Sequence, residues 1–75
     1  MEEKLKSIFV ESLNINEVDV TDNLAYSEHP KWDSVAHLLL VTAIEEAFDI
    51  YFEPDDVVDM SSFAKAKSIV SGYLE

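Results

Sequence analysis

Residues 32–48 read WDSVAHLLLVTAIEEAF, and this stretch decides the fold. Asp33 is a good N-cap, because its carboxylate can accept the free backbone N–H groups of a first helical turn. The residues after it recur at helical spacing, and a projection at about 100° per residue separates two faces. We therefore predict a helix that begins at Asp33 or Ser34 and ends near Phe48.

The predicted helix has an apolar stripe on each of two opposite sides. One stripe should lie in the core and consists of Leu40, Val41, Ile44 and Phe48. The other should face the surface beside two acids, and this face consists of Val35, Leu39, Thr42, Glu45 and Glu46. A surface-facing apolar stripe edged by acids is typical of a docking face for another protein. We therefore expect the second face to bind a partner.

Two further long helices and one short helix are predicted on either side of this stretch. They span about Glu2–Leu13, Pro54–Asp59 and about Ser62–Leu74. Asn14 is the expected stop of the first helix, Pro54 suits a first helical position, and Ser62 is an N-cap candidate. The only β-like run, 50–52, is too short to pair alone, so no strand is predicted.

A long polar loop over 14–33 should connect the first helix to the central one. Ile15, Val18 and Leu24 are spaced along it, and we expect them to pin the loop across the core. Loops of this length are uncommon in compact domains and are often functional. The chain should form one all-α domain over 1–75, with a core that includes Leu5, Ile8, Phe9, Leu40, Val41, Ile44, Phe48, Phe63, Val70 and Leu74. Ala66 should lie on the same inner stripe of the last helix as Phe63, Val70 and Leu74.

The charge balance limits the classes of partner. The chain has 75 residues, with 16 acidic side chains against five lysines, and its net charge is −11. Because 48% of the residues are hydrophobic, the composition is that of a globular domain and not of a disordered acidic tail. Nucleic acids and anionic membranes would repel this charge, whereas basic docking patches on partner proteins would attract it.

Cysteine is absent from the sequence, which excludes disulfides, thiolate catalysis and cysteine metal sites. The segment 1–13 has early acids and an interrupted apolar pattern, so we do not expect it to be a signal peptide. The longest apolar run, 38–41, is far too short to cross a bilayer. We therefore expect no stable membrane insertion and take a cytoplasmic location as the default.

Ser34 is the residue whose position suggests chemistry. It follows Asp33, opens the central helix and ends the long loop, so its hydroxyl should be exposed near the positive end of the helix dipole. Phosphate groups bind well at such an end. Taken alone, a serine at this position is most often a capping residue.

The remaining polar candidates have structural interpretations. His37 lies one turn into the helix on its inner side, where a lone histidine is usually a satisfied residue at the edge of a core. His29 precedes a proline and should be a turn residue. The acid pairs 45–46 and 55–56 should lie on solvated faces. We therefore predict no catalytic residue and no metal ligand.

The stretch from Trp32 to Val41, followed by Ile44-Glu45-Glu46-Ala47-Phe48-Asp49-Ile50, resembles the central helix of acyl carrier proteins. That family has an Asp-Ser-Leu motif, an apolar helix and a Glu-Glu-x-Phe segment. Here the motif reads Asp33-Ser34-Val35. The resemblance covers nearly the whole chain and implies an acyl-carrier-like bundle of three main helices and one short helix, with a long first loop.

The resemblance also implies a function. In the family, a phosphopantetheinyl transferase moves 4′-phosphopantetheine from coenzyme A onto the motif serine, here Ser34, and Asp33 belongs to the same motif. The thiol of the arm then holds an acyl group as a thioester, and acyl-loading and acyl-using enzymes dock through basic patches onto the second helix. Such a carrier catalyses nothing itself, and we expect a monomer.

The chain departs from the family pattern at several positions. Val35 stands in place of the usual leucine, and Ala36, Leu39 and Thr42 make the early helix less acidic than in many fatty-acid carriers. Trp32 before the motif resembles specialised carriers outside core fatty-acid synthesis. An aminoacyl carrier of the D-alanyl type remains an alternative, as does an unmodified acidic helical adaptor. A peptidyl carrier is disfavoured, because no glycine precedes the serine.

The net charge leads to a prediction about salt. Self-repulsion among the acids should destabilise the folded chain at low ionic strength, because few counterions then screen it. Added sodium chloride or magnesium should therefore raise the melting temperature, as followed by circular dichroism. A melting temperature that stays constant across the salt series would contradict this prediction.

Overall fold

The computed structural model describes residues 1–74 and is an all-α bundle, as predicted. Its elements are α1 (Glu2–Leu13), the 3₁₀ helix η1 (Glu17–Asp19), α2 (Ser34–Phe48), α3 (Pro54–Asp59) and α4 (Phe63–Leu74). Within these residues no β-strand forms, and the only sheet-like contact is an isolated bridge between Ala25 and Ser62. The expected single domain was 1–75, of which Glu75 lies outside the described residues.

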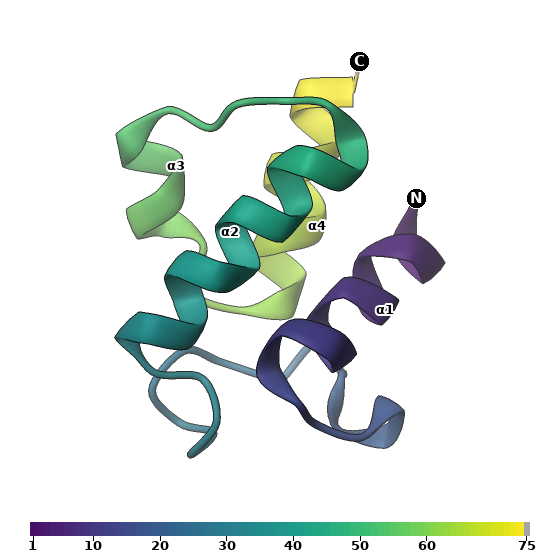
Figure 1. Ribbon diagram of the computed structural model, residues 1–75, viewed down its shortest axis with the longest axis vertical. Coiled ribbons are helices and arrows are strands. Elements are labelled where there is room, and N and C mark those ends of the chain that lie inside the picture. The colour runs from purple at the N-terminus through teal and green to yellow at the C-terminus, as the bar shows by residue number, and fades with distance from the viewer. Residues whose placement is uncertain (75) are drawn as a thin grey trace.

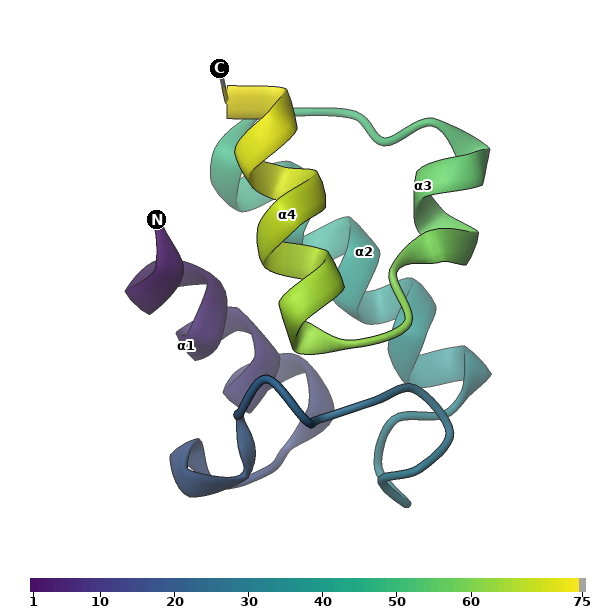
Figure 2. The ribbon, with the colours of Figure 1, turned by 180° about the vertical axis from the view of Figure 1, so that it is seen from behind.

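The three long helices pack around a common core. Figure 1 shows α1 and α2 side by side and running in opposite directions, with α4 on the far side of α2. The reverse view in Figure 2 shows the short α3 beside α2 and α4, on the side away from α1. The long first loop crosses the end of the bundle at which α2 begins. That end is therefore built from loop and helix together.

The helix boundaries follow from local sequence. Asn14 and Asp49 end α1 and α2 in the left-handed conformation, with φ values of 54° and 55°. Short polar side chains tolerate this conformation better than most residues do. Pro54 opens α3, and the Ser62 hydroxyl accepts a hydrogen bond from the Lys65 N–H at 3.0 Å, which caps α4. The predicted caps at Asn14, Pro54 and Ser62 are confirmed.

Most of the predicted core is buried, and two positions differ. The buried members are Leu5, Ile8, Phe9, Leu40, Val41, Ile44, Phe63, Ala66 and Val70. Leu74 is 46% exposed, so its placement in the core is wrong; it is the last residue of α4, beyond the part of the helix that the other elements cover. Phe48 is only half-buried at the end of α2, where the Lys4 ammonium lies 5.0 Å from its ring centroid.

The first loop is pinned to the core, although by a partly different set of side chains. Ile15 and Leu24 are buried as predicted, whereas Val18 is 81% exposed. The chain forms the turn η1 around Val18, which points outward, and Val20 takes the buried position. Trp32 at the end of the loop is fully buried and was not predicted as core.

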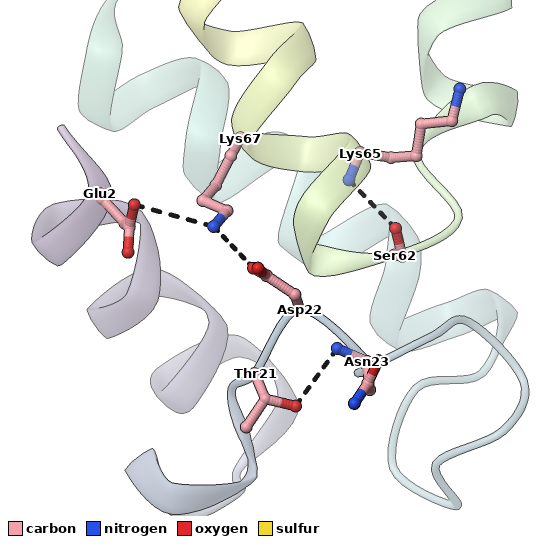
Figure 3. A network of polar contacts seen from close by, with 7 residues as sticks. All are labelled: Glu2, Thr21, Asp22, Asn23, Ser62, Lys65 and Lys67. Atoms are coloured by element: carbon pink, nitrogen blue, oxygen red, sulfur yellow. Dashed lines mark hydrogen bonds and ion pairs between the residues drawn. The ribbon is translucent and has the colours of Figure 1, made fainter.

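Lys67 of α4 ties the loop to two helices. Figure 3 shows its ammonium between Glu2 of α1, at 3.7 Å, and Asp22 of the loop, at 2.6 Å. The hydrogen bond with the Asp22 carboxylate raises the pKa of Lys67 above its usual value. A further bond from the Asn23 N–H to the Thr21 hydroxyl shapes the same turn. In an acidic chain, one cation therefore joins three segments.

Phe9 is a fully buried aromatic residue of α1 that contacts two other rings of the core, so its loss should be costly. Its ring meets Trp32 and Phe63 edge to face, with centroids 5.3 and 5.0 Å apart. Phe9→Ala should cost about 3–5 kcal/mol of unfolding free energy, against roughly 4–11 kcal/mol expected for a domain of this length. Urea denaturation measures this cost.

Val18→Ala serves as the control for Phe9→Ala, because the Val18 side chain is mostly in solvent. It should change the unfolding free energy by less than about 0.5 kcal/mol. Equal costs for the two variants would show that the loop packs differently from this structure.

Candidate functional site

Ser34 is the first residue of α2, and its side chain is exposed. Asp33 is the N-cap, and its Oδ1 accepts a hydrogen bond from the Ala36 N–H at 2.9 Å. The Asp33 backbone oxygen accepts a second bond from the His37 N–H at 2.9 Å. The capping role predicted for Asp33 is confirmed. These bonds fix where the helix begins, and so they fix where the serine hydroxyl emerges.

The buried Trp32 indole anchors the start of α2 in the core. Its ring packs edge to face on Phe9 of α1 and stacks on His37 of α2, with a centroid distance of 5.9 Å and an interplanar angle of 29° to the imidazole. A residue fully buried two positions before Ser34 leaves the helix start little freedom to shift. Sequence reasoning missed this role, because Trp32 belongs to no helical period.

His37 joins three segments through both ring nitrogens. Its Nδ1 lies 3.0 Å from Nε1 of Trp32, and its Nε2 lies 2.8 Å from the Val57 carbonyl oxygen of α3. An indole N–H can only donate and a carbonyl oxygen can only accept. The neutral ring with its proton on Nε2 therefore satisfies both bonds. The prediction that His37 is a satisfied residue at the core edge is confirmed.

Tyr26 of the first loop is the hydrogen-bond partner of Ser34. The two hydroxyl oxygens lie 2.8 Å apart, and either can be the donor. The Tyr26 ring packs edge to face on Trp32 and His37, with centroid distances of 6.2 and 5.3 Å. Sequence reasoning did not find this contact, because a loop residue eight positions before the serine shows no pattern that places it there.

A groove of about 340 Å³ opens beside the serine, between α2 and α3. Its walls are mostly apolar, with the hydroxyls of Ser34 and Tyr26 at one part of its lining. The lining residues are Tyr26, Ser34, His37, Leu38, Val57, Val58, Met60 and Ser61. The transfer of an apolar group from water to such a surface is favourable, because it lowers the free energy. The groove can therefore accept an apolar chain that starts at the serine.

The surface of α2 at and beside the groove exposes three large apolar side chains. Val35, Leu38 and Leu39 are 69%, 63% and 60% exposed. Of the predicted docking face, Val35, Leu39, Thr42 and Glu46 are exposed, and Leu38 adds to it. Glu45 differs, because its side chain turns back on the chain.

Glu45 is half-buried, and its carboxylate accepts a hydrogen bond from the Phe52 N–H at 2.9 Å. This bond holds the connection after α2 against the helix. The carboxylate is thus already engaged within the chain, whereas Glu46 projects freely into solvent. Both acids remain part of the negative field around the docking face.

The other polar candidates fit structural roles. His29 is a turn residue as predicted, and its Nδ1 accepts a hydrogen bond from the Lys31 N–H at 3.1 Å. In residues 1–74, no three histidine or acidic side chains gather closely enough to form a metal site. None of the helices in the described chain combines the length and apolarity that a membrane span needs.

A comparison of the sequence with models of known protein families finds no match. The interpretation of the site therefore depends on its geometry and on the resemblance carried by its residues.

The pair formed by Trp32 and His37 leads to a stability prediction. Trp32→Phe removes the indole N–H and leaves His37 Nδ1 without its donor, so it should cost about 1–3 kcal/mol of unfolding free energy. Urea denaturation measures the cost, and Tyr51→Phe, at a ring that is 83% exposed, should be nearly neutral.

A double-mutant cycle separates this hydrogen bond from general packing. If the bond matters, Trp32→Phe combined with His37→Leu should cost less than the sum of the two single variants. Strict additivity would show that the two side chains act independently.

Proposed function

We propose that this protein is an acyl carrier that holds its cargo on a 4′-phosphopantetheine arm attached to Ser34. One observation carries the proposal: an exposed serine hydroxyl opens α2, directly after its capping aspartate, at the edge of an apolar groove. This arrangement gives an accessible oxygen at a fixed position and an apolar surface that can shield an apolar chain. The resemblance of the Asp33-Ser34-Val35 motif to that of acyl carriers supports the same conclusion.

The residues around Ser34 fit a phosphopantetheine group. The hydroxyl is accessible, and the positive end of the α2 dipole tolerates a phosphodiester. Leu38, Val57 and Met60 line the groove with apolar surface beside the attachment point. When bound, the group supplies the thiol that the cysteine-free chain lacks. The chain's own part is to present the oxygen, to keep the helix start fixed and to shield an apolar cargo.

The attachment step is a phosphoryl transfer from coenzyme A. The Ser34 oxygen attacks the phosphorus atom next to the pantetheine, a P–O bond forms to the serine, and the P–O bond to adenosine 3′,5′-bisphosphate breaks. The serine proton leaves to a base on the transferase, and the bisphosphate departs with the electron pair. The protein supplies the nucleophile, while the transferase supplies the catalysis.

The surface fits partners with basic docking patches. Val35, Leu38 and Leu39 form an exposed apolar strip next to Ser34, and Thr42 and Glu46 continue it along α2. With a net charge of −11, the chain attracts basic surfaces over a distance and speeds encounter. The proposed partners are a phosphopantetheinyl transferase and enzymes that load or use the acyl group. We place the carrier in the cytoplasm as a monomer.

Two other functions are kept as outcomes of the test. An aminoacyl carrier would use the same arm on Ser34 with a polar cargo, and the mostly apolar groove favours an acyl chain over it. An unmodified adaptor would use the apolar strip of α2 alone and would take up no prosthetic group. The adaptor also gives no reason for a serine hydroxyl at the edge of the groove.

The test is intact mass spectrometry after incubation with coenzyme A and a phosphopantetheinyl transferase of broad specificity. The protein should gain the mass of one phosphopantetheine, and Ser34→Ala should gain nothing. Ser61→Ala is the matched control, because Ser61 is a second exposed serine that lines the same groove, and this variant should be modified like the parent chain.

Two results would overturn the proposal. A parent chain that stays unmodified with the transferase, and is also unmodified when isolated from its own cells, would favour the adaptor. Loss of modification in Ser61→Ala with retention in Ser34→Ala would move the attachment site. The mass found in protein from its own cells also separates an acyl cargo from an aminoacyl one.

A further inference from the structure

Tyr26 is held in place by contacts from three directions. Its backbone N–H donates to the Ser61 carbonyl oxygen at 2.8 Å, so the loop is tied here to the connection between α3 and α4. Next to it, the Phe63 N–H donates to the Leu24 carbonyl oxygen at 2.9 Å. The ring is fixed in turn by its packing on Trp32 and His37. The hydroxyl group is therefore set at a defined position, although it belongs to a loop.

The chain between Tyr26 and Ser34 is folded so that the two side chains meet. Ser27 adopts a positive φ of 72°, which is uncommon for a residue other than glycine. Its N–H donates to the Trp32 carbonyl oxygen at 3.0 Å and closes the segment into a compact turn. The Trp32 N–H then bonds to the His29 carbonyl oxygen at 3.0 Å. This turn brings the tyrosine hydroxyl to the serine oxygen.

The two hydroxyls are not equivalent once the serine is esterified. In the unmodified chain either oxygen can donate to the other. An esterified serine oxygen has lost its proton, so only the Tyr26 hydroxyl can still donate. The charged oxygens of a phosphodiester are stronger acceptors than a neutral ester oxygen, because charge-assisted hydrogen bonds are roughly twice as strong as neutral ones.

We infer that Tyr26 is a positioning residue for the prosthetic group, with its hydroxyl donating a hydrogen bond to the phosphodiester at Ser34. This inference rests on the proposed function and adds a role to a residue outside the serine motif. Tyr26 lines the same groove as Ser34, so the bond keeps the root of the arm on the groove side of the serine. The same hydroxyl thus orients the free serine before modification and the phosphate after it.

The experiment compares the parent chain with Tyr26→Phe, which keeps the ring and removes only the hydroxyl. Tyr51→Phe is the control, because Tyr51 is 83% exposed and lies outside the lining of the groove. All three are loaded with phosphopantetheine, and the loaded proteins are examined by phosphorus NMR. Tyr26→Phe should shift the phosphodiester resonance, because the phosphate loses a donor, and Tyr51→Phe should leave it in place.

The stabilities of the loaded and unloaded proteins give a second readout. If Tyr26 had a purely structural role, Tyr26→Phe would destabilise both forms equally. Tyr26→Phe should lower the folding equilibrium constant of the loaded protein by about 2- to 10-fold more than it lowers that of the unloaded protein. The excess arises because the bond to a charged phosphate is stronger than the bond to a hydroxyl. The same ratio should be about one for Tyr51→Phe.

A measurement on the parent chain covers the case in which Tyr26→Phe does not fold. In the loaded protein, nuclear Overhauser effects should connect the Tyr26 ring protons to the pantetheine methylene next to the phosphate. If the parent chain takes up no phosphopantetheine, the proposed function fails and this inference fails with it. If it is loaded but these effects are absent, or the phosphorus resonance of Tyr26→Phe is unchanged, only the role of Tyr26 is overturned.

Discussion

The burial of the Trp32 indole is the constraint on which the site depends. The ring is fully enclosed between Phe9 of α1 and His37 of α2, and the chain leaves the core directly after it. Asp33 then caps the helix, and Ser34 follows as the first helical residue, exposed to solvent. A large side chain fixed inside the core thus specifies, to within a residue, which hydroxyl is presented. The packing of Trp32 in the core therefore determines where the Ser34 hydroxyl oxygen lies.

The sequence predicted the helices well because their ends are encoded locally. Asn14 ends α1 through its left-handed backbone, Pro54 starts α3 through its ring and Ser62 caps α4 through its hydroxyl, so no distant contact is needed to predict these ends. The inner stripe of α2 was equally readable from its period. The burial of side chains at helix ends could not be predicted in this way. Phe48 and Leu74 follow the helical period, but no other element covers them fully at the ends of α2 and α4.

The first loop was predicted only in part, because Ile15 and Leu24 are buried as expected but its other contacts were missed for a different reason. Its apolar residues have no period, so the pattern could not tell that Val20 is buried while Val18 is in solvent. The Tyr26–Ser34 and Trp32–His37 hydrogen bonds join the loop to α2, and each depends on how the whole turn over 26–34 closes. The Asp33-Ser34-Val35 motif was enough to predict the position of the serine. The contacts around the serine depend on the tertiary structure and could not be predicted from the motif.

The least anchored wall of the groove is α3. It has six residues, none of them fully buried, and of these Val57 packs partly against the core, while the other ties of α3 to neighbouring helices are hydrogen bonds. His37 holds the Val57 carbonyl oxygen from α2, and the Tyr73 hydroxyl of α4 donates to Asp56, a bond that raises the pKa of Tyr73. A short helix held by a few hydrogen bonds opens at a lower free energy than one packed in the core. The groove therefore combines a fixed side, where the aromatic cluster sets Ser34, with an adaptable side, and the proposed binding of an apolar chain would use both.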